Sequence, residues 1–313
     1  MNDSSILPRQ WGAFLLTAIS APAVAAASRL PWVWSLTVTI LAAAAALCMC
    51  RLRPQNSPRW LAALQAVFLT VLLWHFALGA DAAFPDENTV PFVPLTLLAV
   101  ALWASSCGES ACIRAVSVLF FAVSILYIIV FLSALKQMQW HRLAAEAPPT
   151  DLLPLGVVML LPLLPTSGER KPVPTAFLIA FLLLPAAASA VCAAIPGSGG
   201  SFYAMAKSVE VLAFAQRIEP LVSVAQTVGW FAALCLILLT ATHLLQSLGL
   251  TRRWQLFLPI LISVPAIVLQ VRIPSGILLL SGAVFCVILP LLAQEIVLEK
   301  KNKKRLKKSK KRC

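Results

Sequence analysis

The sequence predicts an all-α polytopic membrane protein with about ten transmembrane helices. Of its 313 residues, 60% are hydrophobic and only 12% are charged, whereas soluble domains carry about 25% charged residues. Apolar runs recur along almost the whole chain, and many reach the roughly 17–25 residues that a helix needs to cross a bilayer. No stretch between them is long enough for a soluble domain of useful size.

The apolar segments fall into two sets of five. The first set covers approximately 11–28, 32–50, 60–80, 91–107 and 114–135. The second set covers approximately 152–165, 174–194, 220–247, 254–271 and 275–297. We therefore expect one transmembrane domain over 1–297, with repeats at about 11–135 and 152–297, followed by a polybasic tail at 298–313.

The basic residues predict the orientation in the membrane. Ten of the 25 Lys and Arg lie in the last fourteen residues, KKNKKRLKKSKKRC. Such a segment next to a membrane favours the cytoplasmic side and binds anionic lipids. Nucleic acid is not an expected partner, because no nucleic-acid-binding fold or aromatic platform accompanies the tail. With an even number of spans, both termini are expected in the cytoplasm.

The loop DAAFPDENTV at 81–90 fits this orientation, because it carries three acids and no base, as an outer loop should.

The N-terminal segment resembles a signal peptide with a cleavage site in AVAAAS at 23–28. Its first ten residues hold one base, Arg9, and one acid, Asp3, which favours a retained first helix.

The titratable residues do not predict an enzyme, a cofactor or a metal site. The eight cysteines form no C-x-x-C pair and the three histidines are dispersed, so no metal framework is expected. No nucleophile–base pair or phosphate loop is recognisable. None of the twelve acids lies at the centre of a predicted span, which argues against a proton-driven pump. Sodium could still be held by hydroxyls and carbonyls, for example at Thr17 and Ser20, although such residues also serve helix packing.

Two segments are expected to be broken helices. The first is interrupted by Ser20-Ala21-Pro22-Ala23, and the sixth, LLPLGVVMLLPLLPTSG at 152–168, is short and rich in proline. Broken helices at matching positions of two repeats predict a binding site near the membrane midplane. Prolines are also ordinary in membrane helices, so this alternative stays open.

The eighth segment supplies further candidates at a similar depth. Gln226 and Thr227 could bind a ligand or a neighbouring helix, and Trp230 could line a pocket or pack in the core. The candidate ligand-binding residues are Thr17, Ser20, Ala21, Pro22, Ala23, Pro162, Gln226, Thr227 and Trp230.

Residues 207–249, KSVEVLAFAQRIEPLVSVAQTVGWFAALCLILLTATHLLQSLG, resemble the B subunit of spore nutrient-germinant receptors, a family of the amino acid–polyamine–organocation (APC) superfamily. Members carry a short arm with a Phe-x-x-Arg-Ile-Glu-like motif before a helix. The matching residues here are Phe214, Arg217, Glu219 and Pro220. The stretch 91–120 is similar to the family's Pro-rich helix entry and cytoplasmic turn, with Gly108, Glu109 and Arg114 at the motif positions.

The resemblance implies a LeuT-like fold of two inverted five-helix repeats with a germinant pocket among helices one, three, six and eight. It implies a larger A subunit and a C-subunit lipoprotein as partners, the inner membrane of the spore as location, and a small nutrient, usually an amino acid, as ligand. Only sixteen residues separate Pro154 from Lys171, so the sixth helix is shortened relative to the family. The alternatives are an amino-acid transporter or exchanger of the APC superfamily, and a receptor scaffold whose pocket has decayed.

The arm before the eighth helix, at 201–217, is expected to be amphipathic and to lie at the outer membrane interface. Arg217 and Glu219 are then outside the hydrocarbon, with an architectural or partner-facing role. Pro220 suits the first turn of a helix, where its missing N–H costs no hydrogen bond.

Overall fold

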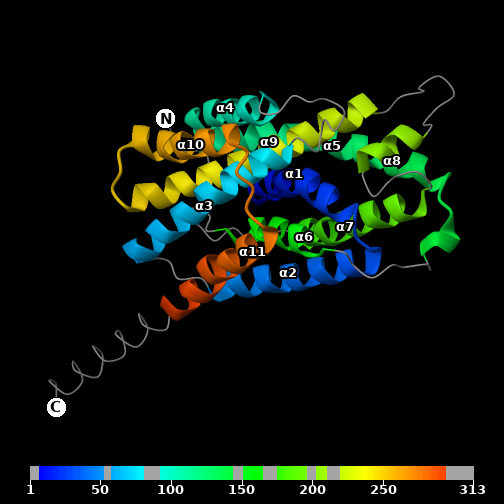
Figure 1. The fold of residues 1–313 in the computed structure, drawn as a ribbon, viewed down its shortest axis with the longest axis horizontal. Helices are drawn as coiled ribbons and strands as arrows, with labels where there is room; N and C mark the ends of the chain where they lie inside the picture. The colour runs from blue at the N-terminus through cyan, green and yellow to red at the C-terminus, as the bar shows by residue number, and fades with distance from the viewer. Residues whose placement is uncertain are drawn as a thin grey trace, which may run out of the picture.

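The computed structural model describes residues 7–52, 58–80, 92–143, 151–164, 175–195, 202–209 and 219–293. Helices dominate these ranges and no strand occurs in them (Figure 1). Five helices within them are long and apolar enough to cross a bilayer: 9–27, 59–79, 109–135, 220–247 and 275–293. The prediction of an all-α membrane protein is confirmed at this level.

Each of the ten predicted segments contains a helix in the described residues. The first five correspond to α1 (Pro8–Ala27), α2 (Trp32–Leu52), α3 (Arg59–Gly79), α4 (Phe92–Ser106) and α5 (Glu109–Leu135). The second five correspond to α6 (Leu153–Val158) with η3 (Leu161–Leu163), α7 (Thr175–Ala194), α9 (Glu219–Ser247), α10 (Arg252–Val268), and α11 (Ser275–Ala283) with the π-turn η4 (Val284–Ile288). Two short helices lie between them, η2 (Trp140–Leu143) and α8 (Phe202–Ser208).

The fifth helix begins at Glu109, earlier than the predicted 114. Gly108 has a φ of 109°, a conformation that glycine adopts without the steric cost that a Cβ imposes. This residue separates α4 from α5, so α5 starts directly after it. Glu109 then lies in the first turn of α5, where a negative charge is favourable to the helix dipole.

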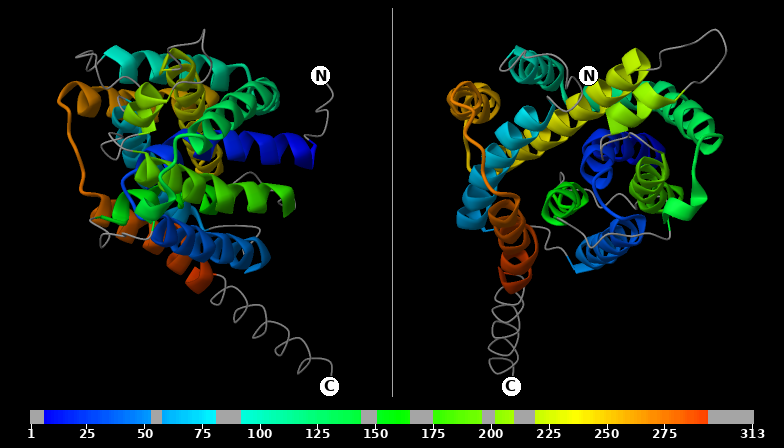
Figure 2. Two further views of the ribbon diagram at one scale, coloured as in Figure 1. Left: turned by 90° about the vertical axis from the view of Figure 1, so that its right-hand side faces the viewer. Right: turned by 45° about the vertical axis from the view of Figure 1, so that its right-hand side comes forward.

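Helix α9 is the centre of the bundle. Residues 232–241 are all buried, and α9 contacts α1, α3, α4, α5 and α10. Figure 2 shows α9 beside α3, and α1 enclosed by α5, α6, α7 and α9. A helix that is apolar on all sides belongs in the interior of a bundle. Residues 232–241 are apolar except for Thr240, which explains the central position of α9.

The crossing of α1 and α9 is very close. A Cβ added at Gly229 would lie 2.5 Å from the Cβ of Ala21 and 2.9 Å from its backbone nitrogen. Small residues at a helix crossing allow the backbones to approach and gain dispersion contacts. Gly229 and Ala21 therefore set the distance between these two helices.

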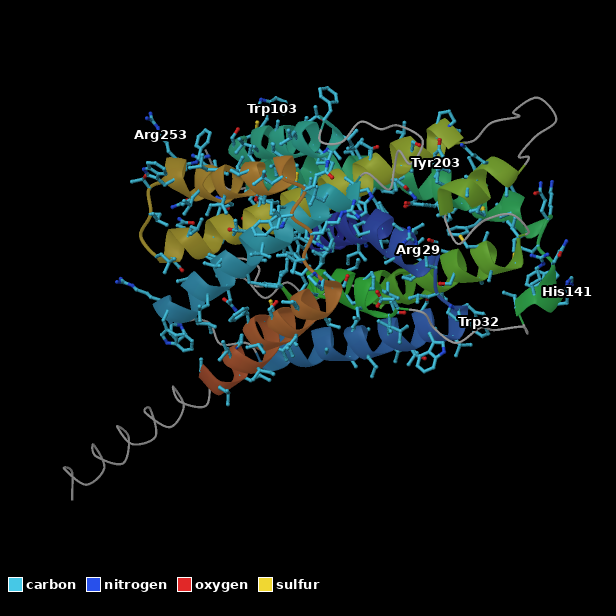
Figure 3. All side chains as sticks on the ribbon, viewed as in Figure 1. Arg29, Trp32, Trp103, His141, Tyr203 and Arg253 are labelled. Carbon is cyan, nitrogen blue, oxygen red and sulfur yellow. The ribbon has the colours of Figure 1, made fainter. Side chains whose placement is uncertain are left out.

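The outward face of α5 carries a continuous apolar stripe. Its members recur at alternating intervals of three and four residues and are more than half exposed: Val118, Phe121, Ile125, Ile128 and Leu132. Exposed apolar area of this extent is unusual on a soluble monomer, and it matches a face in contact with lipid chains. Charged and polar side chains such as Arg253 and His141 lie instead at opposite ends of the bundle (Figure 3).

The predicted interruption of the first segment is wrong, because α1 runs without a break through Ser20 and Pro22. Pro22 lacks only the N–H that would bond the carbonyl of Ala18, and its neighbours Ala21 and Ala23 are completely buried. Tight packing on both sides of the proline holds the helix together. The sixth segment is interrupted as predicted, since α6 ends at Val158 and η3 follows after a turn.

The arm before α9 is helical only over α8 within the described residues. Phe202 and Met205 are fully buried, and the Phe202 ring packs against Tyr127 and Phe131 of α5. The apolar face of α8 is therefore covered by the bundle and is not free at a membrane interface. Phe214, Arg217 and the tail at 298–313 lie outside the described residues.

Candidate ligand-binding site

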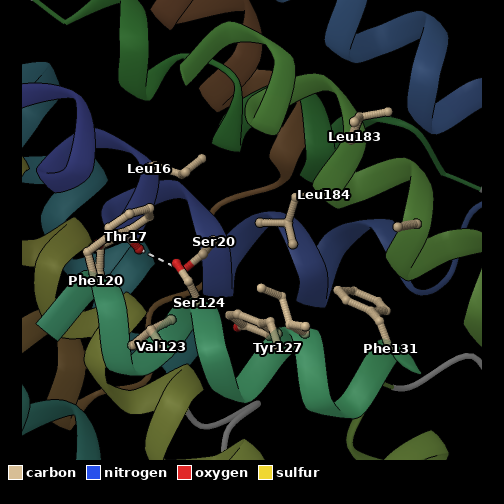
Figure 4. Close-up of a pocket in the computed structure, with 12 residues that line it drawn as sticks. Leu16, Thr17, Ser20, Phe120, Val123, Ser124, Tyr127, Phe131, Leu183 and Leu184 are labelled. Atoms are coloured by element: carbon tan, nitrogen blue, oxygen red, sulfur yellow. Dashed lines mark hydrogen bonds between the residues drawn. The ribbon is translucent and has the colours of Figure 1, made fainter. Parts of the chain in front are cut away.

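A cavity of about 310 Å³ lies between α1, α5 and α7 (Figure 4). This volume is at the lower end of the range of about 300–1,000 Å³ that is typical of small-molecule pockets. The lining residues come from the middle of each helix: Leu16, Thr17, Ser20, Phe120, Val123, Ser124, Tyr127, Ile128, Phe131, Leu183, Leu184 and Ala187. All of them are uncharged.

Helix α1 contributes two hydroxyls to the cavity. Thr17 Oγ1 donates to the carbonyl of Ala13 at 2.8 Å, and Ser20 Oγ donates to the carbonyl of Thr17 at 2.8 Å. Each hydroxyl has thereby used its single hydrogen within the helix, and its oxygen lone pairs remain as acceptors. Both side chains are buried.

Tyr127 on α5 offers the complementary group. Its hydroxyl is buried beside the Ser20 side chain, but no hydrogen bond of good geometry joins it to any part of the chain that the structure describes. The ring stacks on Phe131 at 6.3 Å and contacts Phe202 at 5.9 Å between centroids, so packing fixes its position. Leaving a buried hydroxyl without a partner costs about 1–3 kcal/mol, which a ligand with an acceptor would recover.

The cavity opens between α5 and α7. Ile128 and Leu183, which line it, are 55% and 59% exposed. Ile128 also belongs to the apolar stripe of α5. The opening therefore faces the side of the bundle that is suited to lipid contact.

The predicted ligand-binding residues only partly meet at this cavity. Thr17 and Ser20 line it, whereas the other candidates lie elsewhere. Ala21, Pro22 and Ala23 are packed in the core, and Pro162 is half-buried in η3. Gln226 is buried on α9, Thr227 donates to the carbonyl of Ser223, and Trp230 packs against Gly79 and Phe76.

The sequence did not lead to Tyr127 and Ser124, or to the α7 residues that line the cavity, Leu183, Leu184 and Ala187. Tyr127 is one of only two tyrosines in the chain, and it stands in the middle of a long apolar run. A phenol at the centre of a membrane helix needs a hydrogen-bond partner, and this requirement was the available signal.

Two further polar contacts lie at the N-terminal end of α5, away from the cavity. His243 Nε2 on α9 lies 2.9 Å from Glu109 Oε2, and Arg252 Nη2 donates to the carbonyl of Ser106 at 3.5 Å. The first contact ties the start of α5 to the end of α9, and the second ties the end of α4 to the start of α10. The contact between His243 and Glu109 also joins 91–120 to 207–249, the two stretches on which the family resemblance rests.

We expect the contact between Glu109 and His243 to contribute modestly to stability, since about a third of each side chain is exposed to solvent. A double-mutant cycle with Glu109→Ala and His243→Ala should give a coupling energy of about 0.5–1.5 kcal/mol in the free energy of unfolding. Reversible denaturation in detergent measures it. A coupling energy of zero would show that the two side chains do not interact.

Within the described ranges, no group of three or more His, Cys, Asp or Glu side chains is arranged to hold a metal ion. Comparison with known protein families gives no match, and no curated protein is similar to the chain.

Proposed function

We propose that this protein is a membrane subunit of a spore nutrient-germinant receptor. It binds a small nutrient in the cavity between α1, α5 and α7 and passes a conformational change to its partners, an A subunit and a C-subunit lipoprotein. The observation that carries the proposal is the cavity itself, which is lined by Thr17 and Ser20 and by Tyr127, whose buried hydroxyl lies beside Ser20 without a hydrogen bond of good geometry in the described residues.

The helix contacts support ten spans in a LeuT-like arrangement of two inverted repeats. Helices at matching positions of the two halves touch one another, as in α1 with α6, α2 with α7, and α3 with α9. Other contacts have a counterpart in which each helix is replaced by the helix at the matching position of the other half. The contact of α1 with α5 corresponds to that of α6 with α11, the contact of α4 with α9 to that of α10 with α3, and the contact of α5 with α9 to that of α11 with α3. Such reciprocity is expected when two five-helix repeats are related by a two-fold axis.

The family assignment is supported by the sequence resemblance of 91–120 and 207–249 and by the contact between them through Glu109 and His243. We place both termini in the cytoplasm and the protein in the inner membrane of the spore. The cytoplasmic position of the termini follows from the basic tail, and the location in the spore follows from the resemblance to the family.

A sensing role is favoured over proton-coupled transport. No Asp, Glu, His, Lys or Arg side chain is buried among the described residues, and proton transport usually needs such a titratable group within the membrane. The second candidate is an amino-acid transporter or exchanger of the APC superfamily, for which the hydroxyls of Thr17 and Ser20 beside the cavity are the relevant observation. The third is a scaffold with a decayed pocket, which the interrupted α6 and η3 favour.

Spores of a deletion strain test the proposal against a panel of nutrients, with amino acids as the main class. We expect loss of germination with one nutrient or a small group of them and normal germination with the rest. Rapid counterflow of a labelled amino acid in proteoliposomes, combined with normal germination, would instead establish the transporter. Assembly with an A subunit without any nutrient binding would establish the scaffold.

A further inference from the structure

The described residues that line the cavity include none that would hold the two charges of an amino acid. A zwitterion placed there would bring an ammonium and a carboxylate among side chains that are all uncharged. Removing such charges from water without an opposite charge costs several kcal/mol for each of them. Because α1 is unbroken beside the cavity, it offers no half-helix terminus with free backbone N–H groups to a carboxylate there.

The hydrogen-bonding groups of the cavity match a neutral hydroxyl. The Tyr127 hydroxyl makes no hydrogen bond of good geometry among the described residues, whereas Thr17 and Ser20 have free lone pairs because their hydrogens are used within α1. A hydroxyl accepts one hydrogen bond and donates another. It can therefore satisfy Tyr127 and one of the α1 hydroxyls at the same time, which a carbonyl or an ether cannot do.

The rest of the cavity favours a hydrocarbon body. Apart from the hydroxyl-bearing residues, the lining consists of Leu, Ile, Val, Phe and Ala side chains. The opening at Ile128 and Leu183 faces the lipid side of the bundle, where an apolar molecule first accumulates from water. A volume of about 310 Å³ suits a small molecule and not an entire lipid.

We propose that the ligand of this cavity is an uncharged alcohol with a hydrocarbon body, which enters from the bilayer between α5 and α7. Its hydroxyl accepts a hydrogen bond from Tyr127 and donates one to Thr17 or Ser20. This inference rests on the proposed function, and it replaces the expected amino acid with a ligand class that the cavity can accommodate.

The full-length protein in lipid nanodiscs allows a direct test by thermal unfolding with 1-octanol, octane or L-leucine. Three proteins are compared: the wild type, Tyr127→Phe, and the matched control Tyr203→Phe, which alters the only other tyrosine away from the cavity. Octanol should raise the unfolding temperature more than octane in the wild type and in Tyr203→Phe. Tyr127→Phe keeps the ring and its packing but should abolish this difference.

Equal effects of octanol and octane on the wild type would overturn the inference, as would an undiminished difference in Tyr127→Phe. Stabilisation by L-leucine that depends on Tyr127 would overturn the alcohol but leave the nutrient receptor standing. Conversely, normal germination of deletion spores on every nutrient would overturn the receptor function and not the binding chemistry. Nanodiscs containing diacylglycerol, a lipid with one free hydroxyl, form a further arm, and stabilisation by this lipid alone would overturn a free alcohol as the ligand.

Discussion

Replacing Gly229 by alanine should destabilise the bundle strongly. The new Cβ would lie 2.5 Å from the Cβ of Ala21, 2.9 Å from its backbone nitrogen and 2.9 Å from the Ser20 hydroxyl. The Cβ and the backbone nitrogen of Ala21 cannot move without moving α1, so α1 and α9 must separate. Overpacking of this kind costs about 1–3 kcal/mol, which exceeds the roughly 1 kcal/mol that alanine gains over glycine in a helix. The unfolding temperature of the purified protein measures the loss.

Gly276→Ala is the matched control for this substitution. A Cβ at Gly276 would meet only the end of the Leu153 side chain at 3.4 Å, which is ordinary van der Waals contact, so the unfolding temperature should stay the same or rise. Gly229→Leu should go further and prevent recovery of a monodisperse protein. If Gly229→Ala were as stable as Gly276→Ala, α1 and α9 would not cross where the structure places them.

Under the proposed receptor function, filling the cavity should abolish the nutrient response while the protein remains folded. Ala187 on α7 lines the cavity, and a phenylalanine there would occupy much of the free volume and displace the ligand. We expect spores that carry Ala187→Phe to need at least tenfold more nutrient for germination, at an unchanged level of the protein in the inner membrane. The dose dependence of germination and an immunoblot of the spore membrane measure the two quantities.

Ala193→Phe provides the comparison on the same helix. Ala193 is exposed and does not line the cavity, so this variant should germinate like the wild type. A normal nutrient response in Ala187→Phe would show that the cavity is not the nutrient site. The same loss of response in both variants would point to a general effect on α7.

The sequence predicts the helices well because the length of an apolar run is a local property. All ten predicted segments contain helix where the structure describes them. The interruption at Ser20–Ala23 is wrong because the effect of a proline depends on its neighbours in space. Gly229 of α9 packs against this part of α1, and no local signal reveals that contact.

The candidate site could be predicted only on the side that α1 supplies. Thr17 and Ser20 were recognisable as hydroxyls beside a proline in an apolar segment. Tyr127 and Ala187 are about sixty residues apart in the sequence, and they share a cavity only because α5 and α7 both pack on α1. Local patterns contain no information about such a long-range arrangement.

The position of the bound nutrient is the most direct test of the proposed receptor site. It can be determined from a structure of the protein in complex with the nutrient that fails to germinate deletion spores. We predict density between α1, α5 and α7, with a polar atom of the nutrient within hydrogen-bond distance of the Tyr127 hydroxyl. Density enclosed instead by α3 and α9 on the other side of α1, with the cavity beside Tyr127 empty, would contradict the account.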